Sequence, residues 1–207
     1  MGTYIKVCGL TNTEDAIMAS KLNVNAIGFN LFEKSKRYIN LNQITKIKAK
    51  LPDDIEIFLL FVNQHREFVS ESLKALPGAI PQFHGEETIE YCESFNTDYV
   101  KAVRIYPTID LEKINQDYKS AKMLILDSFN DDAYGGTGQT FNLSLIEGKI
   151  NLPFLVAGGI DESNFKQAVV LDNCIGIDVC SSIEDKPGIK NHKKLKNLVK
   201  NVRSFNV

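Results

Sequence analysis

Short apolar runs alternate along the chain with longer segments in which apolar residues recur at helical spacing. This alternation predicts βα units, in which helices join the strands of a parallel sheet. Strands are expected where aliphatic, β-branched and aromatic residues cluster. There are eight such runs: 3–8, 26–30, 55–62, 79–83, 99–105, 122–127, 153–158 and 174–179.

The segments between these runs carry the start signals and apolar stripes of helices. In the first segment, Thr11 and Asn12 precede the acidic residues Glu14 and Asp15, which suit the positive N-terminal end of a helix. Comparable patterns predict helices over 40–50, 65–76, 86–95, 109–118, 161–171 and 189–204, with a short one over 142–148.

Eight βα units in 207 residues, about 26 residues each, suit a closed (β/α)8 TIM barrel. The alternative is an open doubly wound sheet. No G-x-G-x-x-G opens the first helix and no G-x-x-x-x-G-K-[ST] occurs, so the nucleotide-binding versions of that sheet lose their main support. No Pro/Gly/Ser-rich linker divides the chain. We therefore predict a single barrel domain over 1–207.

The charge balance argues against a nucleic-acid partner. Lys plus Arg total 24 and Asp plus Glu total 26, a formal net charge of −2, whereas nucleic-acid binding needs a concentrated basic surface. The lysine-rich stretch 190–200 has the pattern of a solvated helix face. With 43% apolar residues, the chain has enough material for one sizeable core.

The four cysteines form no CxxC pair and have no histidine at zinc-ligand spacing, so neither a metal site nor a disulfide framework is expected. No apolar run approaches the roughly 18 residues that a membrane span requires. The first ten residues show no secretory signal pattern. We predict a cytoplasmic protein without a membrane partner.

Functional side chains of a (β/α)8 barrel gather at the carboxyl ends of the strands. The loops that follow the seventh and eighth predicted strands hold Gly158-Gly159 and Ser181-Ser182, and Asp178 lies in the eighth. Backbone N–H groups at glycines and at a helix start can bind an anion, and these two loops hold phosphate in many barrel enzymes. We predict a phosphate site here. A plain tight turn is the alternative for the glycine pair.

Two residues at this edge can transfer protons. Asp127 ends a very apolar run, at the edge of a low-dielectric interior, which suits a general acid; capping of the next turn is the alternative. Cys8 ends the first strand and can act as a base or nucleophile, or it is an inert buried thiol. The Gly-rich segment 127–141 is long and irregular, as lids and merely flexible loops both are.

Four further residues are candidates for substrate binding. Gln82 lies at the end of the fourth strand, His84 follows that strand, and Arg104 lies near the end of the fifth. His84 and Arg104 can equally be structural, the latter by pairing with a carboxylate. Arg37, after the second strand, has the planar fork that binds a carboxylate, unless it is only one of several solvated charges.

In order and spacing, these features resemble the phosphoribosylanthranilate isomerase family of tryptophan biosynthesis. The resemblance runs from the first strand to the last helix. The matching stretches are Lys6-Val7-Cys8-Gly9-Leu10-Thr11-Asn12, Gly28-Phe29 with Ser35-x-Arg37, Phe61-Val62-Asn63, Gln82-Phe83-His84-Gly85-Glu86, Lys101-Ala102-x-Arg104, Leu126-Asp127, Gly135-Gly136-Thr137-Gly138, Ala157-Gly158-Gly159-Ile160 and Asp178-x-x-Ser181.

The resemblance implies an Amadori rearrangement of a phosphosugar, without metal or organic cofactor. It implies that Asp127 is the general acid and Cys8 the general base, and that Arg37 binds the anthranilate carboxylate. It also implies that the phosphate is bound by Gly136, Gly158, Gly159, Asp178, Ser181 and Ser182. A monomer or a weak homodimer is expected.

Three positions depart from the family pattern. Ser182 stands where glycine is usual, Cys180 where a small hydroxyl residue is common, and Asn191 where aspartate is frequent. The first two bear on the phosphate site and the third on the start of the last helix.

Two rival functions are compatible with a barrel of this kind. An aldose–ketose isomerase of histidine biosynthesis uses a carboxylate pair at strands one and five, where this chain has Cys8 and Arg104; a pentose-phosphate epimerase is a related alternative. A catalytically inactive binding barrel is the other rival, and the intact pair Cys8 and Asp127 counts against it.

Overall fold

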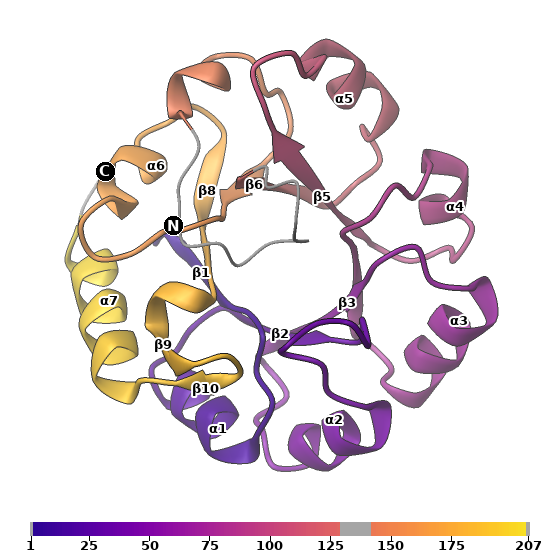
Figure 1. The fold of residues 1–207 in the computed structure, drawn as a ribbon, viewed down its shortest axis with the longest axis vertical. Coiled ribbons are helices and arrows are strands. Elements are labelled where there is room, and N and C mark those ends of the chain that lie inside the picture. The colour runs from indigo at the N-terminus through magenta and orange to yellow at the C-terminus, as the bar shows by residue number, and fades with distance from the viewer. Residues whose placement is uncertain (1, 129–141, 206–207) are drawn as a thin grey trace.

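The structure, a computed structural model, describes residues 2–128 and 142–205. Eight parallel strands close into a barrel in chain order, β1 to β8, with β8 pairing back onto β1 (Figure 1). The strands are β1 (Tyr4–Val7), β2 (Ala26–Asn30), β3 (Glu56–Phe61), β4 (Ile80–Phe83), β5 (Val100–Ile105), β6 (Met123–Ser128), β7 (Phe154–Val156) and β8 (Cys174–Val179). The predicted (β/α)8 barrel and its eight strands are confirmed.

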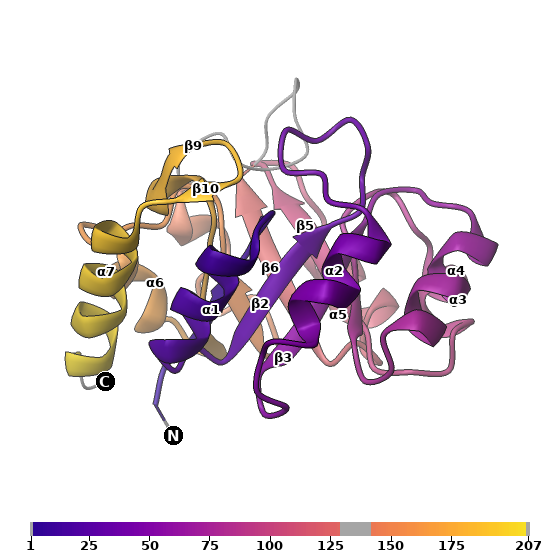
Figure 2. The same cartoon turned by 90° about the horizontal axis from the view of Figure 1, so that it is seen from below.

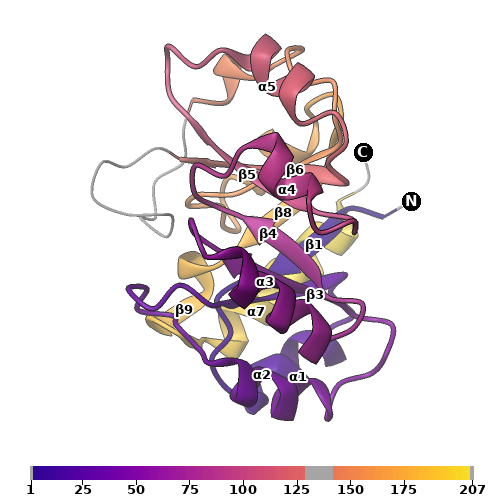
Figure 3. The same cartoon turned by 90° about the vertical axis from the view of Figure 1, so that its right-hand side faces the viewer.

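Helices lie around the outside of the barrel and pack on its outer face, as two perpendicular views show (Figures 1 and 3). They are α1 (Thr13–Lys21), α2 (Leu41–Lys48), α3 (Arg66–Ala75), α4 (Ile89–Glu93), α5 (Leu111–Asp117), α6 (Phe165–Val169) and α7 (His192–Ser204), with the 3-10 turns η1 (Leu143–Leu145) and η2 (Ser181–Ile183). Every predicted helix has a counterpart, but α4 and α6 are about half as long as expected. None of the helices in these ranges is long and apolar enough to cross a membrane.

Side chains alternate between the barrel lumen and the outer face along each strand, because successive residues of a strand point to opposite sides. On β6, Leu124 and Leu126 belong to the large core between strands and helices, whereas Met123 and Ile125 belong to a separate cluster that fills the lumen. The same alternation sends Asp127 into the lumen. The lumen is a packed core whose upper layer is polar.

The segment 189–204 was predicted as one helix, and its first residues are not helical. A two-stranded antiparallel hairpin, β9 (Glu184–Lys186) and β10 (Ile189–Lys190), precedes α7. Gly188 has φ +82°, and Pro187-Gly188 is the residue pair that a tight turn of this kind favours. Figure 2 shows the hairpin at the edge of the barrel toward which the strands β5 and β6 run.

The hairpin also corrects the interpretation of the lysine-rich stretch. Lys190 was predicted on a solvated helix face, but it is buried and its Nζ lies 2.8 Å from Glu184 Oε1. Asn191 then caps α7, because its side chain accepts a hydrogen bond from Lys194 N at 2.9 Å. Asparagine serves this capping role as well as aspartate does.

Candidate active site

The carboxyl ends of the strands bring the two predicted proton-transfer residues into the same lumen. On β1, Ile5 and Val7 face the helices, so Lys6 and Cys8 point inward. Asp127 does the same at the end of β6. All three side chains are buried, with Cys8 7% and Asp127 4% exposed. The structure therefore places the acid and the thiol on strands that are separated by β7 and β8.

A line of polar side chains leads to Asp127. Its Oδ1 accepts a hydrogen bond from Ser128 N at 2.8 Å, and its Oδ2 lies 3.3 Å from His84 Nε2. On the other side of the ring, His84 Nδ1 lies 3.1 Å from Gln82 Nε2. In this orientation of the Gln82 amide, Nε2 of Gln82 donates to Nδ1 of His84, which assigns the imidazole proton to the ring nitrogen that faces Asp127.

Gln82 Oε1 is buried without a hydrogen-bond partner among the described residues, and His84 Nε2 makes no hydrogen bond there either, only the 3.3 Å approach to Asp127 Oδ2. Leaving such atoms unpaired is costly unless a ligand or water completes them. The predicted substrate-binding residues Gln82 and His84 are thus grouped at the acid and directed into the lumen.

Cys8 lies in a crowded part of the lumen. A Cβ atom at Gly28 would come within 2.9 Å of Cys8 Sγ and 3.0 Å of Lys6 Nζ, so only glycine leaves room for both groups. Burial raises the pKa of the Cys8 thiol to about 12, although the Lys6 ammonium acts in the opposite direction. The thiol is therefore protonated at neutral pH in the free protein.

Directly below this layer, a buried ion pair joins neighbouring strands. Lys6 Nζ lies 3.0 Å from both carboxylate oxygens of Asp178, and the two residues are register partners on β1 and β8. Burial alone lowers the pKa of the Lys6 ammonium, but the Asp178 carboxylate outweighs it and the pKa is raised. Sequence reasoning did not assign Lys6 a role, and it placed Asp178 with the phosphate.

The loops after β7 and β8 meet at the same edge. Gly158 and Gly159 have φ of +72° and +68°, and a Cβ at Gly158 would lie 2.6 Å from Asp127 Oδ1. Ser182 Oγ donates to Ile160 O at 2.5 Å and so joins the two loops. The predicted phosphate residues of these loops are therefore next to one another and next to the acid. Gly136 and most of the segment 127–141 lie outside the described residues.

Arg37 is held by the hairpin. Its Nε lies 2.9 and 3.1 Å from the two carboxylate oxygens of Glu184, and its Nη2 lies 2.7 Å from Oε2. Lys190 approaches the same carboxylate, and Cys180 Sγ lies 3.9 Å from Glu184 Oε1. The two cations lower the pKa of Glu184 although burial opposes them. Cys180 belongs to the loop after β8, and its Sγ lies beside the carboxylate that binds Arg37.

Glu87 is a further buried carboxylate, which the sequence pattern did not indicate. Glu87 accepts hydrogen bonds from Asn63 N at 2.7 Å, Gly85 N at 2.9 Å and Lys101 Nζ at 3.0 Å. These bonds tie together the ends of β3, β4 and β5 and so support the loop that carries His84. A lysine inside an apolar strand run, as at Lys101, was the available signal, because a lysine is almost never fully buried unless it is paired.

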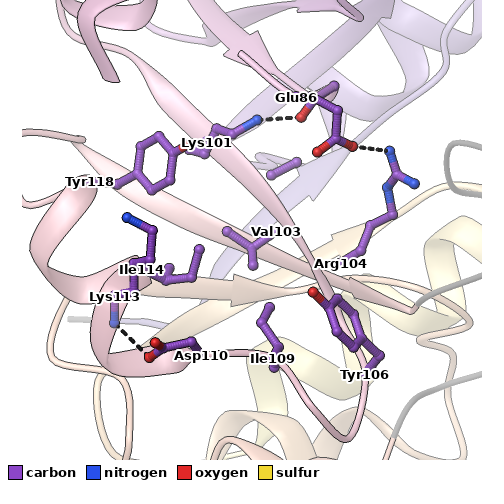
Figure 4. A pocket seen from close by; sticks show the side chains of 12 residues that line it. Glu86, Lys101, Val103, Arg104, Tyr106, Ile109, Asp110, Lys113, Ile114 and Tyr118 are labelled. Carbon is purple, nitrogen blue, oxygen red and sulfur yellow. Dashed lines mark hydrogen bonds and ion pairs between the residues drawn. The ribbon is translucent and has the colours of Figure 1, made fainter. Parts of the chain in front are cut away.

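A cavity of about 570 Å³ lies beside β5 and α5 (Figure 4). Arg104 borders it and binds Glu86 Oε1 at 3.0 Å, so this arginine does pair with a carboxylate of the rim. Cys8, His84 and Asp127 do not line the cavity, and the chemistry belongs to the lumen instead. Among the residues that the structure describes, no group of three or more His, Cys, Asp or Glu side chains is placed to hold a metal ion.

The fold and these side chains define a (β/α)8-barrel protein with an acid and a thiol at the carboxyl ends of its strands. A sequence model of the family N-(5'phosphoribosyl)anthranilate (PRA) isomerase matches residues 5–201. The chain belongs to this family. It is an enzyme, an isomerase of tryptophan biosynthesis.

Individual relatives agree over the whole length. An N-(5'-phosphoribosyl)anthranilate isomerase of Legionella pneumophila (strain Corby) is 35% identical over 196 residues, covering 95% of each chain. The crystal structure of phosphoribosyl anthranilate isomerase from Thermus thermophilus has a TM-score of 0.89 at 27% identity, covering 98% of this chain and 100% of that one. A further solved isomerase (TM-score 0.85, 28% identity, 98% and 100% covered) is a complex with reduced 1-(o-carboxyphenylamino)-1-deoxyribulose 5-phosphate.

Proposed function

We propose that this protein converts N-(5'-phosphoribosyl)anthranilate to 1-(o-carboxyphenylamino)-1-deoxyribulose 5-phosphate, with Asp127 as general acid and Cys8 as general base. The observation that carries the proposal is the joint placement of these two residues, buried and lumen-facing, at the ends of β6 and β1. The complex of the solved relative supports a phosphosugar of this type as the ligand.

The reaction needs one proton donor and one acceptor. Asp127 gives its proton to the ribose ring oxygen, the C1–O bond breaks, and the nitrogen lone pair forms a Schiff base at C1. The thiol proton of Cys8 first leaves to solvent. The Cys8 thiolate then takes the proton from C2, and the C–H electron pair moves to give an enolamine. This enolamine tautomerises to the ketone. Such positioned proton transfers each accelerate a reaction by roughly 10² to 10⁴.

His84 supports the acid in this proposal. Its Nε2 proton faces Asp127 Oδ2 at 3.3 Å, so it stabilises the carboxylate that forms when Asp127 has given its proton away. Gln82 fixes the ring orientation through Nδ1. The unpaired Oε1 of Gln82 is an acceptor for a sugar hydroxyl. Arg104 would act at the rim, where it pairs with Glu86.

The two ends of the substrate are held at the two sides of the rim. Arg37 uses Nε and Nη2 toward Glu184, and its remaining edge is assigned to the anthranilate carboxylate. The joined loops with Gly158, Gly159, Ser181 and Ser182 are assigned to the phosphate, as Gly136 is by resemblance. Asp178 is predicted from the sequence to lie at the phosphate, but a carboxylate repels a phosphate. In this proposal Asp178 is therefore the partner of Lys6.

The test uses purified protein with phosphoribosylanthranilate and a chelator, and follows the ketone carbon of the product by ¹³C NMR. We expect turnover by the wild type. In Asp127→Asn and Cys8→Ser we expect kcat to fall by about 10³ or more. Cys92→Ala, which removes a buried thiol far from the lumen, is the control and keeps wild-type kcat.

Two results would contradict the proposal. Undiminished activity of Asp127→Asn would remove the acid from the mechanism. Turnover of a different phosphosugar, with phosphoribosylanthranilate left untouched, would remove the assigned substrate. The cytoplasmic location, the absence of a cofactor and the monomeric or weakly dimeric state stay predictions.

A further inference from the structure

The buried lysine of the lumen has no part in the reaction as described so far. Lys6 is completely buried, its Nζ binds both oxygens of Asp178, and it lies 5.4 Å from the centre of the Phe58 ring. Replacing a buried ion pair by apolar side chains of similar volume is often neutral or stabilising. Stability alone therefore does not account for a charged pair at this place.

The position of the pair points to the thiol. Lys6 and Cys8 lie two residues apart on β1 and face the same side, and the site of a missing Cβ at Gly28 is 3.0 Å from Nζ and 2.9 Å from Sγ. The ammonium and the thiol are thus neighbours across the side-chain gap that Gly28 leaves. An ammonium in a low-dielectric surrounding favours a thiolate beside it.

We propose that Lys6 is a positioning residue of the active site: its ammonium stabilises the thiolate of Cys8, and Asp178 limits that effect by sharing the same ammonium. This inference rests on the proposed role of Cys8 as the base. It extends that role, because an ion pair that does not contact the substrate then sets the base strength of Cys8.

The other charged and titratable groups around Cys8 act less directly. Arg37, from the loop after β2, and Lys190, on β10, both bind Glu184, so their charges are shared with that carboxylate. Cys180, after β8, is a second thiol next to these two cations. Lys6 is the cation on the strand of Cys8 itself, with Asp178 as its partner on β8.

The two ends of the ion pair have opposite effects on the thiol, and this gives the test its direction. Lys6→Met removes the cation, so the pKa of Cys8 rises above its value of about 12 and the thiolate becomes rarer. Asp178→Asn removes the carboxylate that competes for the ammonium, so the pKa of Cys8 falls. A purely structural ion pair predicts loss of stability in both variants and no opposite change at the thiol.

The experiment measures the rate at which iodoacetamide alkylates Cys8 at pH 8, with the modified peptide located by mass spectrometry and no substrate present. We expect alkylation about tenfold faster in Asp178→Asn and about tenfold slower in Lys6→Met than in the wild type, a pKa change of about one unit each way. In the isomerase assay, Lys6→Met lowers kcat about tenfold or more, while KM stays within about twofold.

Two further variants keep the result decisive. The double variant Lys6→Met/Asp178→Asn has no buried charge left unpaired, so it folds even where Lys6→Met does not, and we expect its alkylation rate to lie between those of the single variants. Lys101→Met breaks the other buried ion pair, with Glu87 at 3.0 Å on the outer side of the barrel. It tests for general loosening and leaves the Cys8 rate unchanged.

Equal alkylation rates in wild type, Asp178→Asn and the double variant would overturn the inference, as would a change in the same direction in both single variants. Because the alkylation assay needs no substrate, its failure is separate from a failure of the proposed function. If the two single variants change the alkylation rate in opposite directions but the wild type does not convert phosphoribosylanthranilate, the assigned reaction is wrong.

Discussion

At the scale of single residues, the site depends on the missing side chains of two glycines as well as on the groups that react. Gly28 leaves the space in which Lys6 and Cys8 meet, and Gly158 leaves the space beside the Asp127 carboxylate. A methyl group at Gly158 would lie 2.5 Å from Ser128 Oγ and 2.7 Å from Ser128 N. Backbone atoms cannot move aside as a flexible side chain does, so the acid would be displaced.

Gly158→Ala is expected to lower kcat by about 100-fold, because a displacement of about 1 Å at a reacting group has an effect of that size. The control is Gly78→Ala. Gly78 has a similar φ of +83°, but a Cβ there meets nothing within 4 Å. Both variants carry the backbone strain of about 1–2 kcal/mol, and only the first should lose activity. Thermal unfolding and steady-state kinetics separate the two effects.

At the scale of elements, the hairpin β9–β10 organises the side of the rim that is proposed to bind the anthranilate carboxylate. It brings Glu184 and Lys190 over the barrel and against Arg37, which comes from the loop after β2. The guanidinium thereby gains a fixed orientation before any substrate is present. Pre-ordering of this kind lowers the entropy that a ligand must remove on binding.

Glu184→Gln keeps the shape of this side chain and removes its charge. We expect KM for phosphoribosylanthranilate to rise about tenfold, equivalent to about 1.4 kcal/mol, while kcat falls less than about threefold, because Arg37 takes no part in the proposed proton transfers. Stability should also fall, since the buried Lys190 and the half-buried Arg37 lose their charged partner. Asp185→Asn, at an exposed position of the same hairpin, is the control. A tenfold loss in kcat with unchanged KM would argue against an orienting role.

At the scale of the whole molecule, the cysteines are distributed through the barrel as buried thiols, Cys8 and Cys92, and half-buried ones, Cys174 and Cys180. Burial raises the pKa of Cys8 and of Cys92 to about 12 and that of Cys174 to about 11. Burial also raises the pKa of Cys180. In the unfolded chain all of them ionise near the ordinary value of 9.0. Folding therefore keeps these groups neutral at a pH where the unfolded chain releases their protons.

This difference makes the fold sensitive to alkali. Above about pH 9 the unfolded state binds fewer protons than the native state, so the free energy of unfolding falls as pH rises to about 11. Each fully buried thiol contributes a loss of the order of 2 kcal/mol over that range. Urea unfolding at several pH values measures the slope. Cys92→Ala should show a shallower decline than the wild type, and equal slopes would contradict this explanation.

Much of the architecture could be predicted because its signals are local. All eight strands follow from short apolar runs, and the alternation along them sends Cys8 and Asp127 to the lumen. Helix ends were less predictable: α4 and α6 begin three or four residues later and end two residues earlier than their spacing predicts, since propensity is only a weak guide to helix ends. The hairpin was not predicted, because the helical spacing of 192–204 was extended back to residue 189. The turn at Pro187-Gly188 places residues 189 and 190 in a strand instead.

Hydrophobic period and turn residues act over a few positions along the chain, so the number and order of the βα units and the residue types at the strand ends could be predicted without the structure. The partners of the buried charges depend on the folded chain. The pairs Lys6 with Asp178 and Arg37 with Glu184 join residues more than 140 positions apart. Closure of the barrel brings β8 and the hairpin after it onto β1 and β2, and no local pattern encodes that contact.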